Sequence, residues 1–379
     1  MKAATEGDRL ISAVLVLVAI IPFIICGCAP HNADRPITTD SDKSPWIYPE
    51  PNSENPIWGV KDGIAVGVQK DGRPPLMDNA PQGTWAPGLL YIMWTDDEGG
   101  TYFFNYIGFT LLSSRGFEQS EPSKTKFFAD NIGYIDNLNK LRSQYGESSQ
   151  EYIDHVNLDR TPPVELSEAA TIDGNAITVV FRLSKFQKND TSVYVIVKIN
   201  KNRPREIEIS AQNMFPQIRP LKYLHVSATA GSLARLRNLW LENESVNSKE
   251  LFKGVTPGPM CFYALKFFGL QRLPIDSQGG ITVYADNDET GEWIGEFGSQ
   301  TAPFYGRPKF YQYWRKYPET YREDLKLTVN GRDCYFGGYL NPCGNEIHGG
   351  TVYENFDMAE EYYEGQTFWF GYTYVLPAP

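Results

Sequence analysis

The fold is decided by residues 193–199, Val-Tyr-Val-Ile-Val-Lys-Ile, in which every second residue is branched and apolar. A period of two is typical of a β-strand that buries one face. The same alternation occurs in residues 181–184 (Phe-Arg-Leu-Ser) and 207–210 (Ile-Glu-Ile-Ser). Because antiparallel strands can be joined by short turns, three such runs in close succession predict an antiparallel sheet.

Turn signals separate further apolar runs on both sides of this region. Asp173-Gly174 joins two runs, an acidic Gly-rich turn at 96–100 joins two more, and Asn330-Gly331 is a strong hairpin signal. The other runs cover residues 64–68, 221–230, 280–285, 325–329 and 367–376.

The sequence has no alternation of strands and helices, no GxGxxG motif after a strand and no P-loop. It therefore predicts an all-β protein, a large antiparallel β-sandwich that forms a single domain over residues 57–379. One or two short helices are expected, at residues 134–145 and near 309–316.

The composition narrows the function classes. The chain has 379 residues, with 35 Lys and Arg against 46 Asp and Glu, and a formal net charge of −11. This acidic balance argues against a nucleic-acid partner, because a surface that follows phosphates must be basic. The aromatic content of 14% argues against a disordered chain.

Residues 1–27 have the pattern of an export signal. Two basic residues precede a sixteen-residue apolar run at 10–25, which is shorter than the about 20 residues of a membrane span. The run ends at Gly27-Cys28 and resembles the bacterial lipoprotein signal, which implies a lipid on Cys28. We expect a cell-envelope lipoprotein, anchored on the periplasmic side or at the cell surface, with a flexible tether at 28–56. The alternative is an N-terminal membrane anchor.

Three cysteines follow the lipid site: Cys261, Cys334 and Cys343. Their odd number excludes a complete disulfide framework. Cys334 and Cys343 flank a Gly-rich segment, and they either pair across a hairpin or remain free buried thiols. No Cys or His spacing fits zinc, so neither a metal nor a cofactor is expected.

Four segments carry a family resemblance: residues 56–63 (PIWGVKDG), 115–117 (RGF), 234–241 (ARLRNLWL), and 353–356 with 363–371 (YENF and YEGQTFWFG). They resemble an uncharacterised family of secreted or lipoprotein-type bacterial proteins from planctomycetes and Bacteroidetes. The resemblance spans most of residues 56–379 and implies a saccharide-related β-sandwich of the galactose-mutarotase-like supersandwich type. It carries no catalytic motif that maps onto single residues here.

The C-terminal segment combines acidic, aromatic and histidine side chains, which is the combination that a sugar site needs. Aromatic rings stack on the apolar faces of sugars, and carboxylates accept hydrogen bonds from sugar hydroxyls. The expected saccharide-binding residues are Tyr353, Asp357, Tyr363 and Trp369, together with Tyr305 and Trp314 from a second aromatic segment. Glu354 is expected to act as acid or base, with His348 as its partner. The alternative is a closing strand whose tyrosines cover the edge of the sandwich.

The spacing of His348 and Glu354 sets a structural condition. Six strand residues span about 20 Å, so the two side chains act together only if the chain turns at Gly349-Gly350. We predict that turn. We also expect Glu354→Gln to weaken saccharide binding or turnover with little loss of thermal stability.

Three further segments have chemical patterns with simpler explanations. Residues 286–291 begin like a calcium loop, but Phe297 stands where the bidentate acid belongs, which favours an acidic turn. Residues 151–160 place His155 among carboxylates and fit a solvated connector. Residues 293–317 interleave aromatics with Arg and Lys, which at this net charge fits an acidic sugar or a packed loop better than nucleic acid.

Together these observations predict an envelope lipoprotein that binds or processes a saccharide at a concave aromatic and acidic sheet face. If it is an enzyme, a glycoside hydrolase or a polysaccharide lyase is expected, and two facing carboxylates would mark a hydrolase. The alternative is a non-catalytic β-sandwich that makes protein–protein contacts in the envelope. The expected partners are a carbohydrate and, through the lipid, a membrane, with no nucleic acid.

Overall fold

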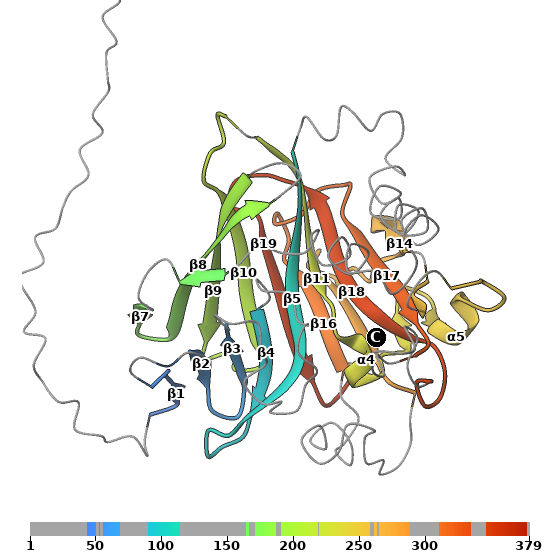
Figure 1. Ribbon diagram of the computed structural model, residues 1–379, viewed down its shortest axis with the longest axis horizontal. Coiled ribbons are helices and arrows are strands. Elements are labelled where there is room, and N and C mark those ends of the chain that lie inside the picture. Colours follow the sequence, from blue (N-terminus) through green and yellow to red (C-terminus); the bar gives the residue numbers. More distant parts are fainter. Residues whose placement is uncertain are drawn as a thin grey trace, which may run out of the picture. The chain divides into compact units, whose positions relative to one another are not determined.

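Two antiparallel sheets pack face to face in the computed structural model (Figure 1). The structure describes residues 44–50, 53, 56–68, 90–113, 164–166, 171–186, 191–218, 220–257, 261–263, 265–288, 311–334 and 346–376. The chain divides into Met1–Ser44 and Pro45–Pro379, and both sheets belong to the second unit. Within the described residues, no helix is both long and apolar enough to cross a membrane.

The first sheet has nine strands. In spatial order they are β1 (Trp46–Ile47), β2 (Ile57–Val60), β3 (Ile64–Gly67), β4 (Leu90–Thr95), β5 (Thr101–Ser113), β11 (Leu221–Ala228), β18 (Val352–Glu361), β17 (Lys326–Arg332) and β14 (Lys266–Gly269). Because β1 pairs with β2, the sandwich begins before the expected boundary at residue 57.

The second sheet has ten strands. In spatial order they are β13 (Ser245–Asn247), β12 (Asn238–Trp240), β15 (Ile281–Asp286), β16 (Tyr311–Lys316), β19 (Thr367–Thr373), β10 (Glu206–Asn213), β9 (Thr191–Asn200), β8 (Ala176–Phe186) and β6 (Val164–Leu166), with β7 (Thr171–Asp173) also paired to β8. The described helices are single turns: α4 (Gly231–Ala234), α5 (Ser248–Leu251) and the 3-10 turn η2 (Leu270–Arg272).

The core lies between the sheets and follows the alternation seen in the sequence. Val193, Val195, Val197 and Ile199 are all buried in it. Phe104 of β5 stacks on Phe370 of β19, with ring centroids 6.0 Å apart. The all-β sandwich that the sequence predicts is therefore confirmed.

One ion pair is buried in the interface between the sheets. Lys316 of β16 and Glu360 of β18 have fully buried side chains and form a direct hydrogen-bonded pair. Lys316 also donates to the carbonyl of Thr367 at 2.7 Å, and the backbone N–H of Arg322 donates to Glu360 at 3.0 Å. These contacts satisfy both charges, without which the burial of either would be costly.

The turn predictions have different outcomes. The hairpin at Asp173-Gly174 is confirmed, with Gly174 at φ +46° between β7 and β8. The hairpin at Asn330-Gly331 is wrong, because both residues lie inside β17. Asn330 pairs with Asn355 and Gly331 with Tyr353, so Glu354 is the extra residue of a β-bulge.

The helix expected near residues 309–316 is also wrong, because residues 311–316 form strand β16. This strand pairs with β15 on one side and with β19 on the other, and period-two burial overrides the apparent helical spacing. The helix expected at 134–145 lies outside the described residues.

Candidate functional site

Strand β18 divides the predicted site residues between its two faces. Tyr353, Phe356 and Met358 point into the core, whereas Glu354 and Asp357 lie on the outer face of the nine-stranded sheet. The sequence prediction that Tyr353 and Glu354 point to opposite sides therefore agrees with the structure. Glu354 and Asp357 share a face although they are three residues apart, because Glu354 is the extra residue of the bulge and shifts the alternation by one.

Glu354 is held by two protein groups. Its Oε1 accepts from Nη1 of Arg332 at 3.1 Å, and its Oε2 accepts from the backbone N–H of Ser232 in α4 at 3.0 Å. Arg332 also lies over the ring of Phe262, with its guanidinium carbon 4.6 Å from the ring centroid. Glu354 is 7% exposed. This arrangement is typical of a carboxylate that fixes α4 to the sheet.

The turn predicted at Gly349-Gly350 is confirmed. These glycines have φ values of +82° and +90°, and the N–H of Gly350 donates to the carbonyl of Ile347 at 2.9 Å. The Arg237 guanidinium donates to the carbonyls of His348 and Gly350 and so stabilises the turn. His348 itself is exposed and Glu354 is buried, so the turn gives no support to an acid–base pair of these two residues.

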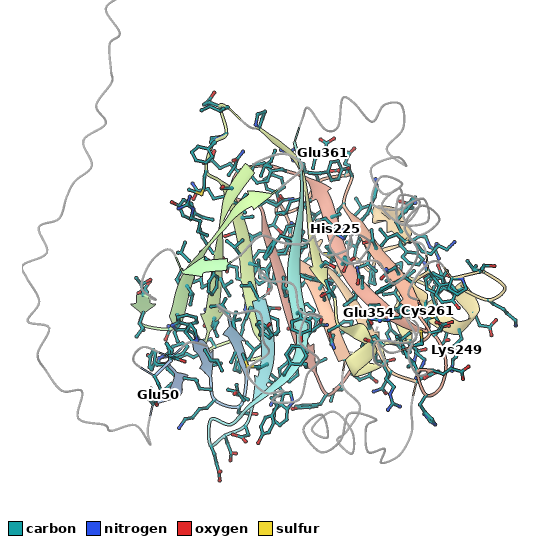
Figure 2. All side chains as sticks on the ribbon, in the orientation of Figure 1. Glu50, His225, Lys249, Cys261, Glu354 and Glu361 are labelled. Carbon is teal, nitrogen blue, oxygen red and sulfur yellow. The ribbon has the colours of Figure 1, made fainter. Side chains whose placement is uncertain are left out.

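A second polar group on the same sheet face was not found from the sequence. His225 and Ser227 come from β11, Thr328 from β17 and Asp357 from β18 (Figure 2 labels His225 and Glu354). Nε2 of His225 lies 3.0 Å from Oδ2 of Asp357, and the Ser227 hydroxyl donates to Oδ1 at 2.6 Å. All four side chains are buried. The only available signal was the alternation of residues 223–227, which places His225 and Ser227 on one face.

This buried group differs from a serine-hydrolase triad. In a triad the hydroxyl bonds to one imidazole nitrogen and the carboxylate to the other. Here Ser227 donates to the carboxylate, and the hydroxyl of Thr328 and the carboxylate of Asp357 both contact the same nitrogen of His225. The geometry therefore supports a buried structural network more than a nucleophile.

Aromatic side chains gather on the outer face of the ten-stranded sheet, which we call the aromatic face. It comprises Trp240, Tyr284, Tyr311, Tyr313, Tyr317 and Trp369. Tyr313 pairs with Tyr284, and Tyr284 pairs with Trp240, so three rings lie side by side on β16, β15 and β12. Tyr313 is buried and the others are half-buried.

Glu206 organises the aromatic face. Its Oε2 accepts from Arg315 at 2.8 Å and from the hydroxyl of Tyr313 at 3.1 Å. Its Oε1 lies 3.4 Å from both the Tyr317 hydroxyl and Nη1 of Arg203. Because two tyrosines and two arginines converge on one carboxylate, the rings are held in fixed orientations before any ligand binds.

Of the predicted saccharide-binding residues, Trp369 reaches this face and meets Tyr317 edge-to-face at 4.6 Å. Trp314 and Tyr353 lie in the core, where their polar hydrogens donate to the carbonyls of Phe356 and Val246. Tyr363 is half-buried, and its hydroxyl donates to the carbonyl of Thr320. Tyr305, and the predicted lipidation site Cys28, lie outside the described residues.

The segment that begins like a calcium loop uses its acids within the protein. Asp286 accepts from Asn238 at 2.8 Å and from the indole of Trp240 at 3.2 Å. Asp288 pairs with Arg237 and Lys249, whose hydrogen bonds and charges hold its pKa below the usual value despite burial. These contacts occupy Asp286 and Asp288 within the protein, and residues 289–291 of the segment lie outside the described residues.

The cysteines differ from the pairing considered above. Of the two alternatives given above for Cys334, the structure has the free, buried thiol. Cys261 is disulfide-bonded, and its partner is not among the described residues. Ligand atoms of Cys261, Asp333 and Cys334 lie within 4.8 Å of one another. With Cys261 oxidised, one thiol and one carboxylate remain, which is too few ligands for a structural metal site.

Comparison with protein-family models, with curated proteins and with solved structures found no match to this chain. The family resemblance of residues 353–356 and 363–371 therefore remains an expectation. The functional argument rests on the two outer sheet faces, of which the polar one is buried and the aromatic one carries half-buried rings.

Proposed function

We propose that this chain is an exported, lipid-anchored protein that binds a saccharide on its aromatic face. The observation that carries the proposal is the setting of Trp369. In register, this indole lies between Glu208 of β10 and Arg315 of β16, and all three side chains are half-buried. A ring with an acceptor on one side and a donor on the other matches the apolar face and peripheral hydroxyls of a pyranose.

The aromatic face also extends far enough for several sugar units. Its rings come from β12, β15, β16 and β19, which are successive neighbours in the sheet. Adjacent strands lie about 4.8 Å apart, so the paired rings of Trp240, Tyr284 and Tyr313 form a row across β12, β15 and β16. Trp369 of β19 is paired with Arg315 and lies beside the end of this row. A row of stacking platforms favours a chain of sugars over a single one. Because Glu206 fixes Tyr313 and Tyr317, little side-chain entropy is lost on binding.

Removing the Trp369 indole is expected to weaken polysaccharide binding. Trp369→Ala should reduce affinity at least about fivefold, because aromatic stacking contributes on the order of 1 kcal/mol or more. The measurement is retardation in native gels containing dissolved polysaccharides, tested over a panel of neutral and acidic glycans. Tyr48→Ala removes an exposed ring that is not part of the aromatic face and should leave retardation unchanged.

The two variants also separate saccharide binding from the alternative of protein contacts. A wild-type chain that no glycan in the panel retards would contradict the saccharide proposal, and so would equal retardation of wild type and Trp369→Ala. Thermal melting of each variant shows that the fold is retained, so that a loss of binding is not a loss of structure.

Lipid anchoring is tested separately. Cys28→Ala should abolish incorporation of a labelled fatty acid and release the protein or leave its signal uncleaved, because the cysteine sulfur accepts the lipid. The control is Cys334→Ala, which removes a buried thiol and should keep the label. Labelling that persists in Cys28→Ala would contradict the lipoprotein proposal, while saccharide binding would remain open to its own test.

A further inference from the structure

The part of the outer sheet face around Trp369 carries more cations than carboxylates, although the chain as a whole has a net charge of −11. Three cations and two carboxylates lie there: Arg203, Arg315, Lys198, Glu206 and Glu208. A local charge that opposes the overall one attracts a ligand of the opposite sign. The charge around the stacking indole therefore favours an anionic ligand.

One carboxylate serves both arginines. Oε2 of Glu206 accepts from Nη1 of Arg315 at 2.8 Å, and Oε1 of Glu206 lies 3.4 Å from Nη1 of Arg203. Among the described residues, neither arginine pairs with a second acid. The side chains of Arg203 and Arg315 are 54% and 27% exposed, so one guanidinium charge remains uncompensated where a ligand can reach it.

Lys198 of β9 supplies the third cation. It is exposed and lies directly opposite Glu208 of β10 in the register, and Glu208 is in turn opposite Trp369. Within the part of the chain that the structure describes, the Lys198 ammonium and the Glu208 carboxylate form neither an ion pair with each other nor a hydrogen bond to another group. Both groups are therefore available to a ligand that stacks on the indole.

The register places these groups in one line across the sheet. Arg315, Trp369, Glu208 and Lys198 occupy paired positions on β16, β19, β10 and β9. Three strand spacings separate the backbone positions of Arg315 and Lys198 by about 14 Å. This span exceeds the width of one sugar ring, so the two cations fit acidic groups on different units of one glycan chain.

We propose that the ligand of the aromatic face is an acidic glycan, an inference that rests on the proposed saccharide binding. One sugar ring stacks on Trp369, and the acidic groups of the chain bind the arginines at one end of the line and Lys198 at the other. A planar guanidinium binds carboxylate and sulfate oxygens equally well. Glu208 accepts from a sugar hydroxyl and repels an acidic group at its own position, which fixes where along the line the acidic groups lie.

Titration calorimetry of the full chain with matched pairs of polysaccharides tests this proposal. The pairs are polygalacturonate and its carboxyl-reduced form, alginate and its carboxyl-reduced form, and dextran sulfate and dextran. We expect at least one acidic member to bind at least about fivefold more tightly than its neutral partner. The difference should shrink as salt is raised, because salt screens exposed charges. The pair that shows the difference identifies the acidic group as carboxylate or sulfate.

Lys198→Gln locates the charge on this face. It should weaken binding of the acidic member about two- to fivefold and leave binding of the neutral member unchanged, because the amide keeps the length of the side chain and removes its charge. Thermal stability should also be unchanged, since Lys198 has no partner to lose within the described residues. The matched control is Lys253→Gln, which alters an exposed lysine that follows α5 and should change neither affinity.

Two results would overturn the proposal. The first is that no acidic polysaccharide binds more tightly than its neutral partner. The second is that acidic binding is stronger but Lys198→Gln reduces it no more than Lys253→Gln does. Neutral binding that Trp369→Ala abolishes would in either case leave the saccharide proposal standing, so the two proposals fail separately.

Discussion

Raising the pH above about 10 is expected to unfold this protein cooperatively, because several of its tyrosines can ionise only in the unfolded chain. Five tyrosines that are at most 7% exposed have pKa values well above the usual 10: Tyr106, Tyr223, Tyr313, Tyr353 and Tyr372. Burial is the largest cause for each of them. Neighbouring carboxylates, such as Asp324 beside Tyr223 and Glu206 beside Tyr313, raise the pKa further.

The sign follows from proton binding. A tyrosine whose pKa is higher in the folded state keeps its proton when the unfolded chain has lost it, so its contribution to stability is complete below pH 10 and falls as the pH rises. Each such tyrosine loses about 1.4 kcal/mol for each pH unit above 10. At about pH 11 five of them remove about 7 kcal/mol, which is comparable with the whole stability of a typical domain.

Lys316 changes stability in the opposite direction at lower pH. Burial lowers its pKa to about 8, and the Glu360 carboxylate only partly offsets this effect. Between this value and its unfolded value of 10.5, the unfolded chain binds more protons, so stability rises with pH. The expected curve therefore rises between about pH 8 and 10 and then falls steeply.

Tyrosinate absorbance and far-ultraviolet circular dichroism, followed together through an alkaline titration, test this prediction. Most of the absorbance change should appear at the same pH as the loss of β-structure. In Tyr353→Phe the stability lost between about pH 10 and 11 should be smaller by about 1.4 kcal/mol, because one ionising group is gone. Absorbance that rises fully while the dichroism stays unchanged would show that the five hydroxyls ionise inside the folded protein.

The second large effect is expected at Glu354. Glu354→Gln should lower the free energy of unfolding by about 3–5 kcal/mol, because it takes the negative charge from a buried ion pair with Arg332. This result would differ from the small stability change expected from the sequence alone. The matched control is Glu208→Gln, which alters a half-buried glutamate on the aromatic face and should change stability by less than about 1 kcal/mol.

Urea unfolding of these variants and of a double variant measures the effect. Replacing both partners, Arg332→Met with Glu354→Leu, should recover most of the lost stability, because no buried charge then lacks its counter-charge. If Glu354→Gln unfolds like the wild type but no longer binds the glycan, the stability prediction is contradicted and Glu354 contacts the saccharide directly.

The sequence predicted the architecture because each relevant signal is local. Alternation in residues 193–199 defines the buried face of β9, and Asp173-Gly174 marks a real turn. The hairpin predicted at Asn330-Gly331 was wrong because tertiary contacts override the usual preference of this dipeptide for turns. The amide of Asn330 accepts from the N–H of Asn355 at 3.0 Å, and a side chain at Gly331 would collide with Phe252. These contacts hold the two residues in a bulge instead of a hairpin.

The candidate site was less predictable, because its composition depends on which strands become neighbours. Trp369 was identified from its own segment. Its neighbours on the aromatic face come from distant parts of the chain, because Glu206 precedes it by 163 residues and Arg315 by 54. His225 was overlooked because Asp357 reaches it only through the pairing of β11 with β18. Local sequence carries no information on such pairings. Alternation identified the core face in residues 193–199, whereas Trp314 and Tyr353, which were expected to bind the saccharide, lie in the core.

The strand order also constrains how this protein can be made. β18 and β19 are the final described strands, yet β18 joins β11 to β17 in one sheet and β19 joins β10 to β16 in the other (Figure 1). Neither sheet can close until residues 352–373 have been synthesised. A chain that emerges N-terminus first, from a ribosome or through a membrane, therefore presents four unpaired strand edges during that interval. Unpaired edges invite aggregation, so this topology creates a need for a chaperone or for rapid completion of synthesis.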